Sequence, residues 1–155
     1  MGWGMRYDII ADTHGYLSDE LLHALEGADV IVHAGDICSS SDLRRLEDIA
    51  PVKFCIGNND YGYDYGPFAK RDYRFYSSKL RWQVCHYRER LDLAVCDVAV
   101  CGHTHRPLVE RDKRYGTLVM NPGSPTHPRA SGPSMGRIMA EEGQVLSAEI
   151  IQLAG

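Results

Sequence analysis

The most constraining feature of this sequence is a repeated order in which a short apolar run ends in a cluster of metal-capable polar side chains. The clusters, in chain order, are Asp12-Thr13-His14, Gly35-Asp36, Gly57-Asn58-Asn59-Asp60, His86 and Gly102-His103-Thr104-His105. Short continuous apolar runs are typical of buried strands. Because ligands bind at the carboxyl ends of the strands in α/β sheets, we expect these clusters to meet at one sheet edge.

The first half of the chain alternates predicted strands with predicted helices. The predicted strands are Tyr7–Ile10, Asp29–His33 and Val52–Ile56. A short helix starts at Asp19 and carries Leu21, Leu22 and Leu25. A second helix is capped by the serines 39–41 and places Leu43, Leu46 and Ile49 on one face. This alternation indicates βαβ units and parallel strands.

The second half predicts hairpins instead. One hairpin joins Tyr73–Tyr76 to Leu80–Cys85, and another joins Arg137–Ala140 to a strand in which Leu146, Ala148 and Ile150 alternate with polar residues. Between them we predict a short helix over Glu89–Val95 and a strand over Asp97–Cys101. The fold class is therefore α/β, with two packed mixed β-sheets flanked by helices, in a single domain over residues 1–155.

Composition excludes several classes of partner. The chain has 155 residues, 44% hydrophobic and 25% charged, as expected for one soluble globular domain. A net charge of −4 and scattered basic residues argue against a nucleic-acid polymer or a membrane surface as partner. We expect no membrane span and no signal peptide. Five cysteines without a CxxC pair predict mostly buried, reduced thiols and a cytoplasmic location.

The polar clusters supply about seven oxygen and nitrogen ligands, which exceeds what one tetrahedral zinc ion uses. The candidates are Asp12, His14, Asp36, Asn58, His86, His103 and His105. Such a set suits two divalent ions that share one carboxylate. The i, i+2 spacing of Asp12 and His14, and that of His103 and His105, places both side chains of each pair on one face if the backbone stays extended. Glycines 35, 57 and 102 allow tight turns and close approach of the backbone to a ligand.

Each cluster alone also fits a structural role. A strand-end aspartate is commonly a cap or turn residue, and Gly57-Asn58-Asn59-Asp60 alone fits a turn. We interpret His23 as a surface residue and His33 as a core histidine with satisfied hydrogen bonds. His127 fits a surface loop better than the site. The ordered combination of clusters is what indicates metal binding.

Together with Asn121-Pro122-Gly123-Ser124, these motifs resemble those of the calcineurin-like metallophosphoesterases. Within that family the resemblance is to small single-domain YfcE-type phosphodiesterases, to which the retromer small subunit is related. It covers nearly the whole chain, from Arg6 to Leu153. It implies that Asp12, His14 and His105 hold one metal ion, that Asn58, His86 and His103 hold a second, and that Asp36 bridges both. Of these, Asp36, Asn58 and His86 are also the expected catalytic residues, and the 121–124 turn has a structural role.

The implied activity is hydrolysis of a small-molecule phosphoester by a hydroxide between the two metals. The first expectation for the substrate is a phosphodiester. Manganese is the first expectation for both ions, and iron, cobalt, nickel or zinc also suit mixed oxygen and nitrogen ligands. Two alternatives stay open: a phosphomonoesterase, and a non-catalytic protein-binding scaffold on the same fold. Assembly of the chain into a homo-oligomer also stays open.

The sequence departs from the family pattern at two positions. Asn59 stands where many phosphatases have a histidine that acts as general acid, an absence shared with YfcE-type members. Tyr87 follows His86 where relatives usually have glycine, and the connection from His86 to His103 is short. The segment Tyr61–Phe68 fits either a surface loop or an aromatic platform for a flat substrate group.

Overall fold

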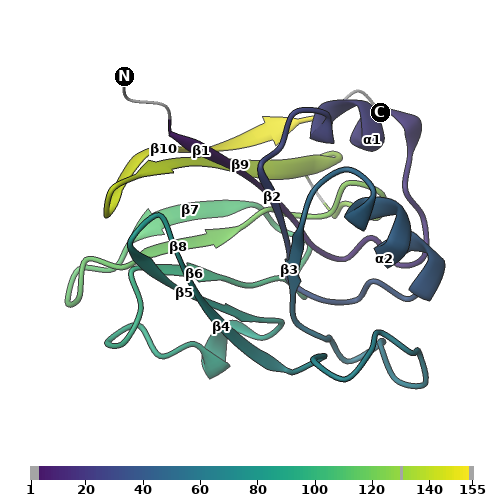
Figure 1. Cartoon of the computed structure of the whole chain (residues 1–155), viewed down its shortest axis with the longest axis horizontal. Helices are drawn as coiled ribbons and strands as arrows, with labels where there is room; N and C mark the ends of the chain where they lie inside the picture. The colour runs from purple at the N-terminus through teal and green to yellow at the C-terminus, as the bar shows by residue number, and fades with distance from the viewer. Residues whose placement is uncertain (1–3, 130, 154–155) are drawn as a thin grey trace.

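A computed structural model of the chain describes residues 4–129 and 131–153, whose strands form two five-stranded sheets (Figure 1). The first sheet has the order β10 (Gln144–Gln152), β9 (Ser134–Glu141), β1 (Met5–Ile10), β2 (Val30–His33) and β3 (Val52–Phe54). The second has the order β4 (Asp72–Ser77), β5 (Leu80–Cys85), β6 (Val98–Val100), β8 (Leu118–Asn121) and β7 (Leu108–Arg111). Both sheets mix parallel and antiparallel pairs, which confirms the predicted fold class.

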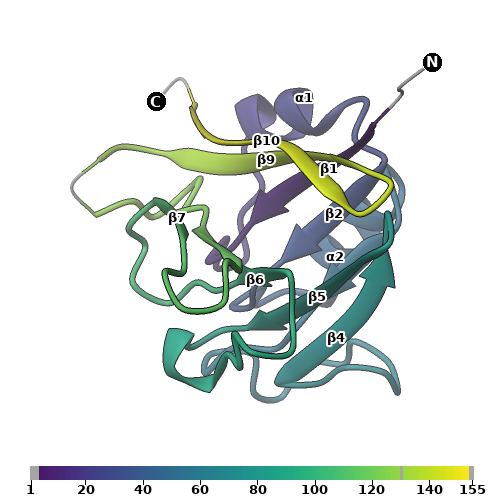
Figure 2. The same ribbon diagram turned by 90° about the vertical axis from the view of Figure 1, so that its left-hand side faces the viewer.

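Strand β1 organises the first sheet. It pairs in parallel with β2, as expected from a strand–helix–strand unit, and antiparallel with β9 on its other side. The C-terminal hairpin therefore returns to the sheet that begins the chain. Figure 2 shows β10, β9 and β1 stacked above β6, β5 and β4 of the second sheet.

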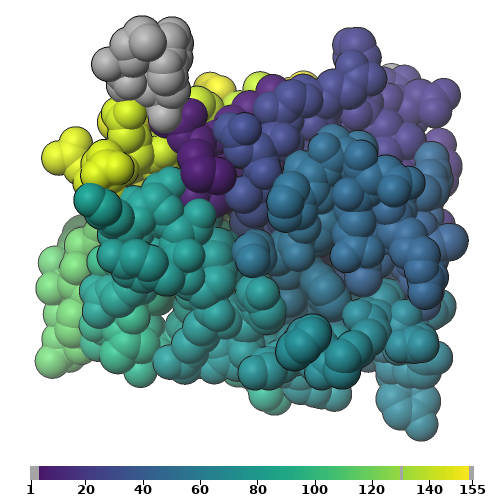
Figure 3. Space-filling view, in the orientation of Figure 1, coloured from purple at the N-terminus to yellow at the C-terminus, as the bar shows by residue number. Residues whose placement is uncertain are grey.

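Both predicted helices form and cover the outer face of the first sheet. Helix α1 (Asp19–Leu25) starts after Ser18, whose hydroxyl accepts from the Leu21 amide, and α2 (Ser40–Glu47) starts after Ser39 in the same way. Leu21, Leu25 and Leu46 pack on Ile10 and Ile31 of the sheet. In the space-filling view, the blue surface that contains α2 adjoins the teal surface of the segment after β3 (Figure 3).

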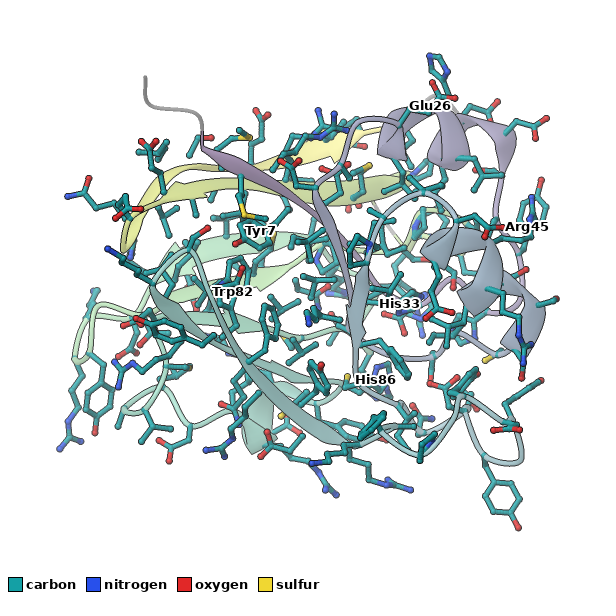
Figure 4. The ribbon with its side chains drawn as sticks, in the orientation of Figure 1. Tyr7, Glu26, His33, Arg45, Trp82 and His86 are labelled. Carbon is teal, nitrogen blue, oxygen red and sulfur yellow. The ribbon has the colours of Figure 1, made fainter. Side chains whose placement is uncertain are left out.

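The main core lies between the two sheets. Tyr7 of β1 and Trp82 of β5 point toward one another there, with ring centroids 4.4 Å apart (Figure 4). Both side chains are almost fully buried. The Tyr7 hydroxyl keeps hydrogen bonds with Ser77 and Ser78 at the β4–β5 turn, so its polar end is satisfied as well.

The predicted helix over Glu89–Val95 is wrong. Only a 3₁₀ turn forms, at Arg88–Arg90, and the following segment lies irregularly on the outer face of the second sheet. Side chains of the sheet take its backbone groups: the Asp92 amide donates to Gln83 Oε1, and the Thr117 hydroxyl donates to the Leu93 carbonyl. These bonds compete with helical ones, while Leu91 and Leu93 bury their side chains against the sheet.

Two strands were not predicted. Strands β7 and β8 form the antiparallel edge of the second sheet, and β8 continues directly into the 121–124 turn. In β10, a bulge between Val145 and Ser147 shifts the predicted alternation. As a result Val145 packs on the core and Leu146 is half-exposed.

Two predictions from composition can be compared with the structure. All five cysteines are free thiols, and four of them are buried. No helix within the described residues has the length and apolar character needed to cross a membrane.

Candidate metal centre

The polar clusters converge at the carboxyl ends of the strands, but the expectation that they meet at the edge of one sheet is wrong, because strands of both sheets contribute. Asp12 follows β1, Asp36 follows β2, His86 follows β5, and His105 lies in the loop after β6. Figure 4 labels two buried histidines of this region, His33 at the end of β2 and His86 directly after β5. The strands thus bring together side chains that lie up to 93 residues apart, as seen for Asp12 and His105.

The ligand atoms of these residues are separated by distances that suit a shared cation. His105 Nε2 lies 3.4 Å from Asp12 Oδ1, and His86 Nε2 lies 3.3 Å from Asp36 Oδ2. His14 Nε2 lies 3.3 Å from His105 Nε2 and 3.7 Å from Asp36 Oδ2. Metal–nitrogen bonds of about 2.1 Å in a tetrahedral site separate neighbouring ligands by about 3.4 Å. Two such groups form, Asp12–His14–His105 and Asp12–Asp36–His86.

Two buried atoms at the centre have no hydrogen-bond partner among the described residues: Asp12 Oδ1 and His86 Nε2. The His86 Nδ1–H donates to the Ala34 carbonyl at 2.8 Å, so its Nε2 carries a lone pair. The His105 Nδ1–H likewise donates to the His127 carbonyl. Lone pairs that face carboxylate oxygens repel unless a proton or a metal ion lies between them. The residues therefore fit divalent metal ions, with second ring nitrogens anchored as is usual for metal-binding histidines.

The pKa values of the candidate ligands reflect the same crowding. Burial lowers the pKa of His86, but the nearby carboxylates of Asp36 and Asp12 outweigh burial and raise it overall. The Asp12 carboxylate likewise raises the pKa of His105 against a smaller effect of burial. Burial opposes ionisation of Asp36, but His86 and the hydrogen bonds from Asn59 hold its pKa well below the usual range.

The expectation of extended backbone at the Asp-x-His and His-x-His motifs is wrong. Asp12, His14, His103 and His105 all have positive φ, between 51° and 72°, as do Asp36 and Cys38. Non-glycine residues rarely adopt this conformation, and its clustering here marks a strained, functional loop set. Because the backbone coils, the His103 ring turns toward His86 while His105 faces Asp12 and His14.

Glycines 35 and 57 permit the close approach that the sequence indicated. Gly35 has a φ of +101°, and a Cβ there would lie 2.9 Å from His86 Nδ1. A Cβ at Gly57 would collide with the Asp36 carboxylate. Any side chain at either position would therefore displace a candidate ligand.

Asp60 holds the two loops together. Its buried carboxylate accepts four hydrogen bonds, from the amides of Asp36, Cys38 and Gly57 and from the Tyr65 hydroxyl, at 2.7–2.9 Å. Tyr65 also packs its edge against Phe54. These contacts favour the structural interpretation of the Tyr61–Phe68 loop, although Tyr61 itself is 93% exposed.

Asn58 and Asn59 are placed differently from one another. The Asn59 amide and side chain both donate to the Asp36 carboxylate, at 2.8 and 2.9 Å. Asn58, the asparagine expected to bind metal, is exposed in the turn, and its side chain has no hydrogen bond within the described residues. The structure thus gathers Asp12, His14, Asp36, His86 and His105 closely, with His103 adjacent and Asn58 at the margin.

Of the other histidines, His33 and His23 match their interpretation, and His127 matches it only in part. His33 is fully buried between Thr13 Oγ1 and the Gly35 amide, and burial lowers its pKa to about 4. His23 is exposed on α1. His127 lies in an exposed loop, yet its ring centroid is 5.1 Å from that of His14. No local pattern around His127 indicates this, because Ser124 and Thr126 position the loop through bonds to carbonyls of the Asp12–Thr13 segment.

Comparison with known proteins agrees with this geometry. Residues 5–143 match the calcineurin-like phosphoesterase superfamily domain. The chain is similar to a probable metallophosphoesterase of Methanothermobacter thermautotrophicus, with 32% identity over 164 residues that cover 96% of this chain and 92% of the relative.

Three solved structures share the fold. Vacuolar Protein Sorting 29 from Cryptosporidium parvum has a TM-score of 0.77 at 17% identity, and the match covers 97% of this chain and 99% of that one. A novel archaeal phosphodiesterase has a TM-score of 0.76 at 22% identity, with 95% and 100% covered. The phosphoesterase YfcE from E. coli has a TM-score of 0.70 at 23% identity, with 94% and 98% covered. The resemblance inferred from the motifs is confirmed.

Proposed function

Because the chain belongs to the calcineurin-like phosphoesterase superfamily, we propose that it is a metal-dependent phosphodiesterase acting on a small-molecule phosphoester. The observation that carries the proposal is the buried pair Asp12 Oδ1 and His86 Nε2, 3.7 Å apart and without hydrogen-bond partners in the described part of the chain. Leaving two such atoms unpaired is costly unless a cation satisfies both.

The proposed centre holds two divalent metal ions, and manganese is the first candidate for both. Asp12, His14 and His105 would bind one ion, and Asn58, His86 and His103 the other, with Asp36 between them. Two bound divalent ions supply an activated hydroxide and neutralise charge on the phosphoryl oxygens. Asn59 fixes the Asp36 carboxylate by its two hydrogen bonds, so Asp36 keeps its orientation when substrate binds.

The preference for diesters rests on the likeness to YfcE-type phosphodiesterases, and the centre also lacks a general acid for the leaving group. Asn59 cannot protonate a leaving group. Burial, with His14 and His105 nearby, lowers the pKa of His127, so this ring is neutral near pH 7 and a poor proton donor. Esters with good leaving groups should therefore react best.

A protein-binding scaffold is the alternative suggested by the shared fold of Vacuolar Protein Sorting 29. The candidate donor set and the unpaired buried atoms at the centre support metal binding, which the proposed hydrolysis requires and a scaffold does not. A reducing compartment such as the cytoplasm suits the five free thiols.

The test is a metal-dependent assay on metal-stripped protein. With Mn²⁺ restored, we expect hydrolysis of bis(4-nitrophenyl) phosphate, slower hydrolysis of 4-nitrophenyl phosphate, and no turnover in EDTA. Asp36→Ala should abolish the activity and His23→Ala should leave it unchanged. A faster monoester reaction would favour the phosphomonoesterase, and an inert protein that still binds Mn²⁺ would favour the scaffold.

A further inference from the structure

A pocket of about 270 Å³ lies against the candidate metal centre on the side of His103. Its interior is formed by the buried residues Cys101, Gly102 and Asn121 and the half-buried residues Tyr87, Pro107 and Leu108. The charged residues of its lining, Arg88, Glu89 and Arg106, are all exposed. The pocket is therefore mainly apolar inside and charged where it meets solvent.

Tyr87 connects this pocket to the candidate ligands. Its ring centroid lies 4.6 Å from that of His103 and 5.4 Å from that of His86. The Arg90 guanidinium lies over the same ring, at 5.8 Å from its centroid. The ring is thus held between the metal centre and the pocket, and both share the His103 side chain as a wall.

The buried polar group of the lining is already satisfied. The Asn121 amide donates to the Gly102 carbonyl and to Thr104 Oγ1, and its oxygen accepts from the Gly123 amide. Arg88 is ion-paired with Glu110. The interior therefore offers apolar contact and an aromatic face, and few free hydrogen-bonding groups.

We infer that this pocket binds one ester arm of the phosphodiester substrate and selects a flat, apolar ring, with Tyr87 as its specificity-determining wall. The inference rests on the proposed function, because the phosphoryl group must be anchored at the metal centre for an arm to reach past His103. A ring that stacks on Tyr87 and contacts Leu108 and Pro107 gains affinity that a small aliphatic arm cannot.

The test compares phenylphosphonate with methylphosphonate, which share the metal-binding group and differ only in the arm. Binding to Mn²⁺-loaded protein is measured by titration calorimetry, independently of turnover. We expect the phenyl compound to bind about tenfold more tightly, the gain for burying roughly 60 Å² more apolar surface. A variant that alters the metal sites changes both affinities alike, so a change in their ratio between native protein and variant reports on the pocket.

Tyr87→Ala should reduce this ratio to about twofold. The matched control is Tyr115→Ala: this tyrosine also carries an arginine, Arg114, over its ring, but it lines a different pocket, with Arg111 and Gln144. It should keep the native ratio. If Tyr87→Ala does not fold, Leu108→Trp fills the pocket from β7 and should lower the ratio in the same way.

Equal affinity of native protein for the two phosphonates overturns the inference about the pocket. An affinity ratio that neither Tyr87→Ala nor Leu108→Trp changes overturns it as well. Hydrolysis of bis(4-nitrophenyl) phosphate is assayed on the same preparation. Hydrolysis of the diester together with equal phosphonate affinities overturns the inference about the pocket and supports the proposed function. A tenfold ratio without turnover overturns the proposed function and keeps an aryl-phosphonate site. Failure of both measurements overturns both.

Discussion

At the scale of single residues, the centre depends on groups that bind no metal. Asp60 is the main one, because its carboxylate joins the loops after β2 and β3 through four hydrogen bonds. The sequence placed Asp60 in a motif but gave no reason for its identity. The structure supplies that reason: three backbone amides and one hydroxyl all require an acceptor.

Asp60→Asn should lower the free energy of unfolding by about 2–3 kcal/mol, because the amide NH₂ cannot accept and leaves buried donors unpaired. Chemical denaturation with urea measures this loss. Asp64→Asn is the control, since Asp64 is exposed and, within the described residues, accepts only the Gly66 amide. Equal stability of the two variants would contradict the role given to Asp60.

The raised pKa values of His86 and His105 predict that metal binding releases protons. Without metal, both imidazoles hold protons at a higher pH than free histidine does, and a ligand must be neutral. Affinity for Mn²⁺ should therefore rise with pH and fall as the pH drops through these raised pKa values. Calorimetry in two buffers of different ionisation enthalpy should give different apparent enthalpies of binding. Identical enthalpies in both buffers would rule out proton release.

At the scale of elements, the sequence predicted those parts whose apolar pattern and caps agree with the tertiary contacts. Strands β1 and β2 and helices α1 and α2 are of this kind. Over Glu89–Val95 the pattern failed, because Gln83 and Thr117 from distant strands take the backbone groups that a helix would use. The hydrogen bonds of Asn59 with Asp36 and the position of His127 beside His14 were not predicted for a similar reason, because both depend on contacts between residues distant in sequence.

A cluster of ion-paired side chains joins β1, β9 and α1 on the outer face of the first sheet, which α1 covers. Asp8 of β1 is fully buried and contacts Arg6 at 2.7 Å and Arg137 of β9 at 2.8 Å. Both arginines also donate to the Ala24 carbonyl in α1. The cluster therefore fixes the end of α1 against β1 and β9, and favourable charge lies at the helix C-terminus.

Asp8→Ala should destabilise the fold by about 3–5 kcal/mol, since it leaves two partly buried guanidinium groups without their carboxylate. Thermal and urea unfolding would measure the change. Glu142→Ala removes the exposed ion pair with Lys79 and should change stability little. A loss for Asp8→Ala no larger than that control would mean that water replaces the carboxylate without cost.

At the scale of the whole molecule, the candidate ligands come from both sheets. Asp12 and Asp36 follow strands of the first sheet, whereas His86 and His105 follow strands of the second. The sheets also meet through apolar contacts such as Tyr7 with Trp82 and through the hydrogen bonds of the Tyr7 hydroxyl with Ser77 and Ser78. A metal ion bound by these side chains would therefore link the two sheets, and its binding energy would add to the stability of the fold.

Saturating Mn²⁺ should thus raise the melting temperature of metal-stripped protein. At a free metal concentration of about 100 times Kd the gain is about 2.7 kcal/mol per site, which for a chain of this size corresponds to about 8 °C. Differential scanning calorimetry measures the shift, and Asp36→Asn should remove most of it because both ions lose a ligand. His23→Ala should retain the full shift, since its ring is exposed on α1. An unchanged melting temperature, or an equal shift in Asp36→Asn, would show that any bound metal is held elsewhere and does not link the sheets.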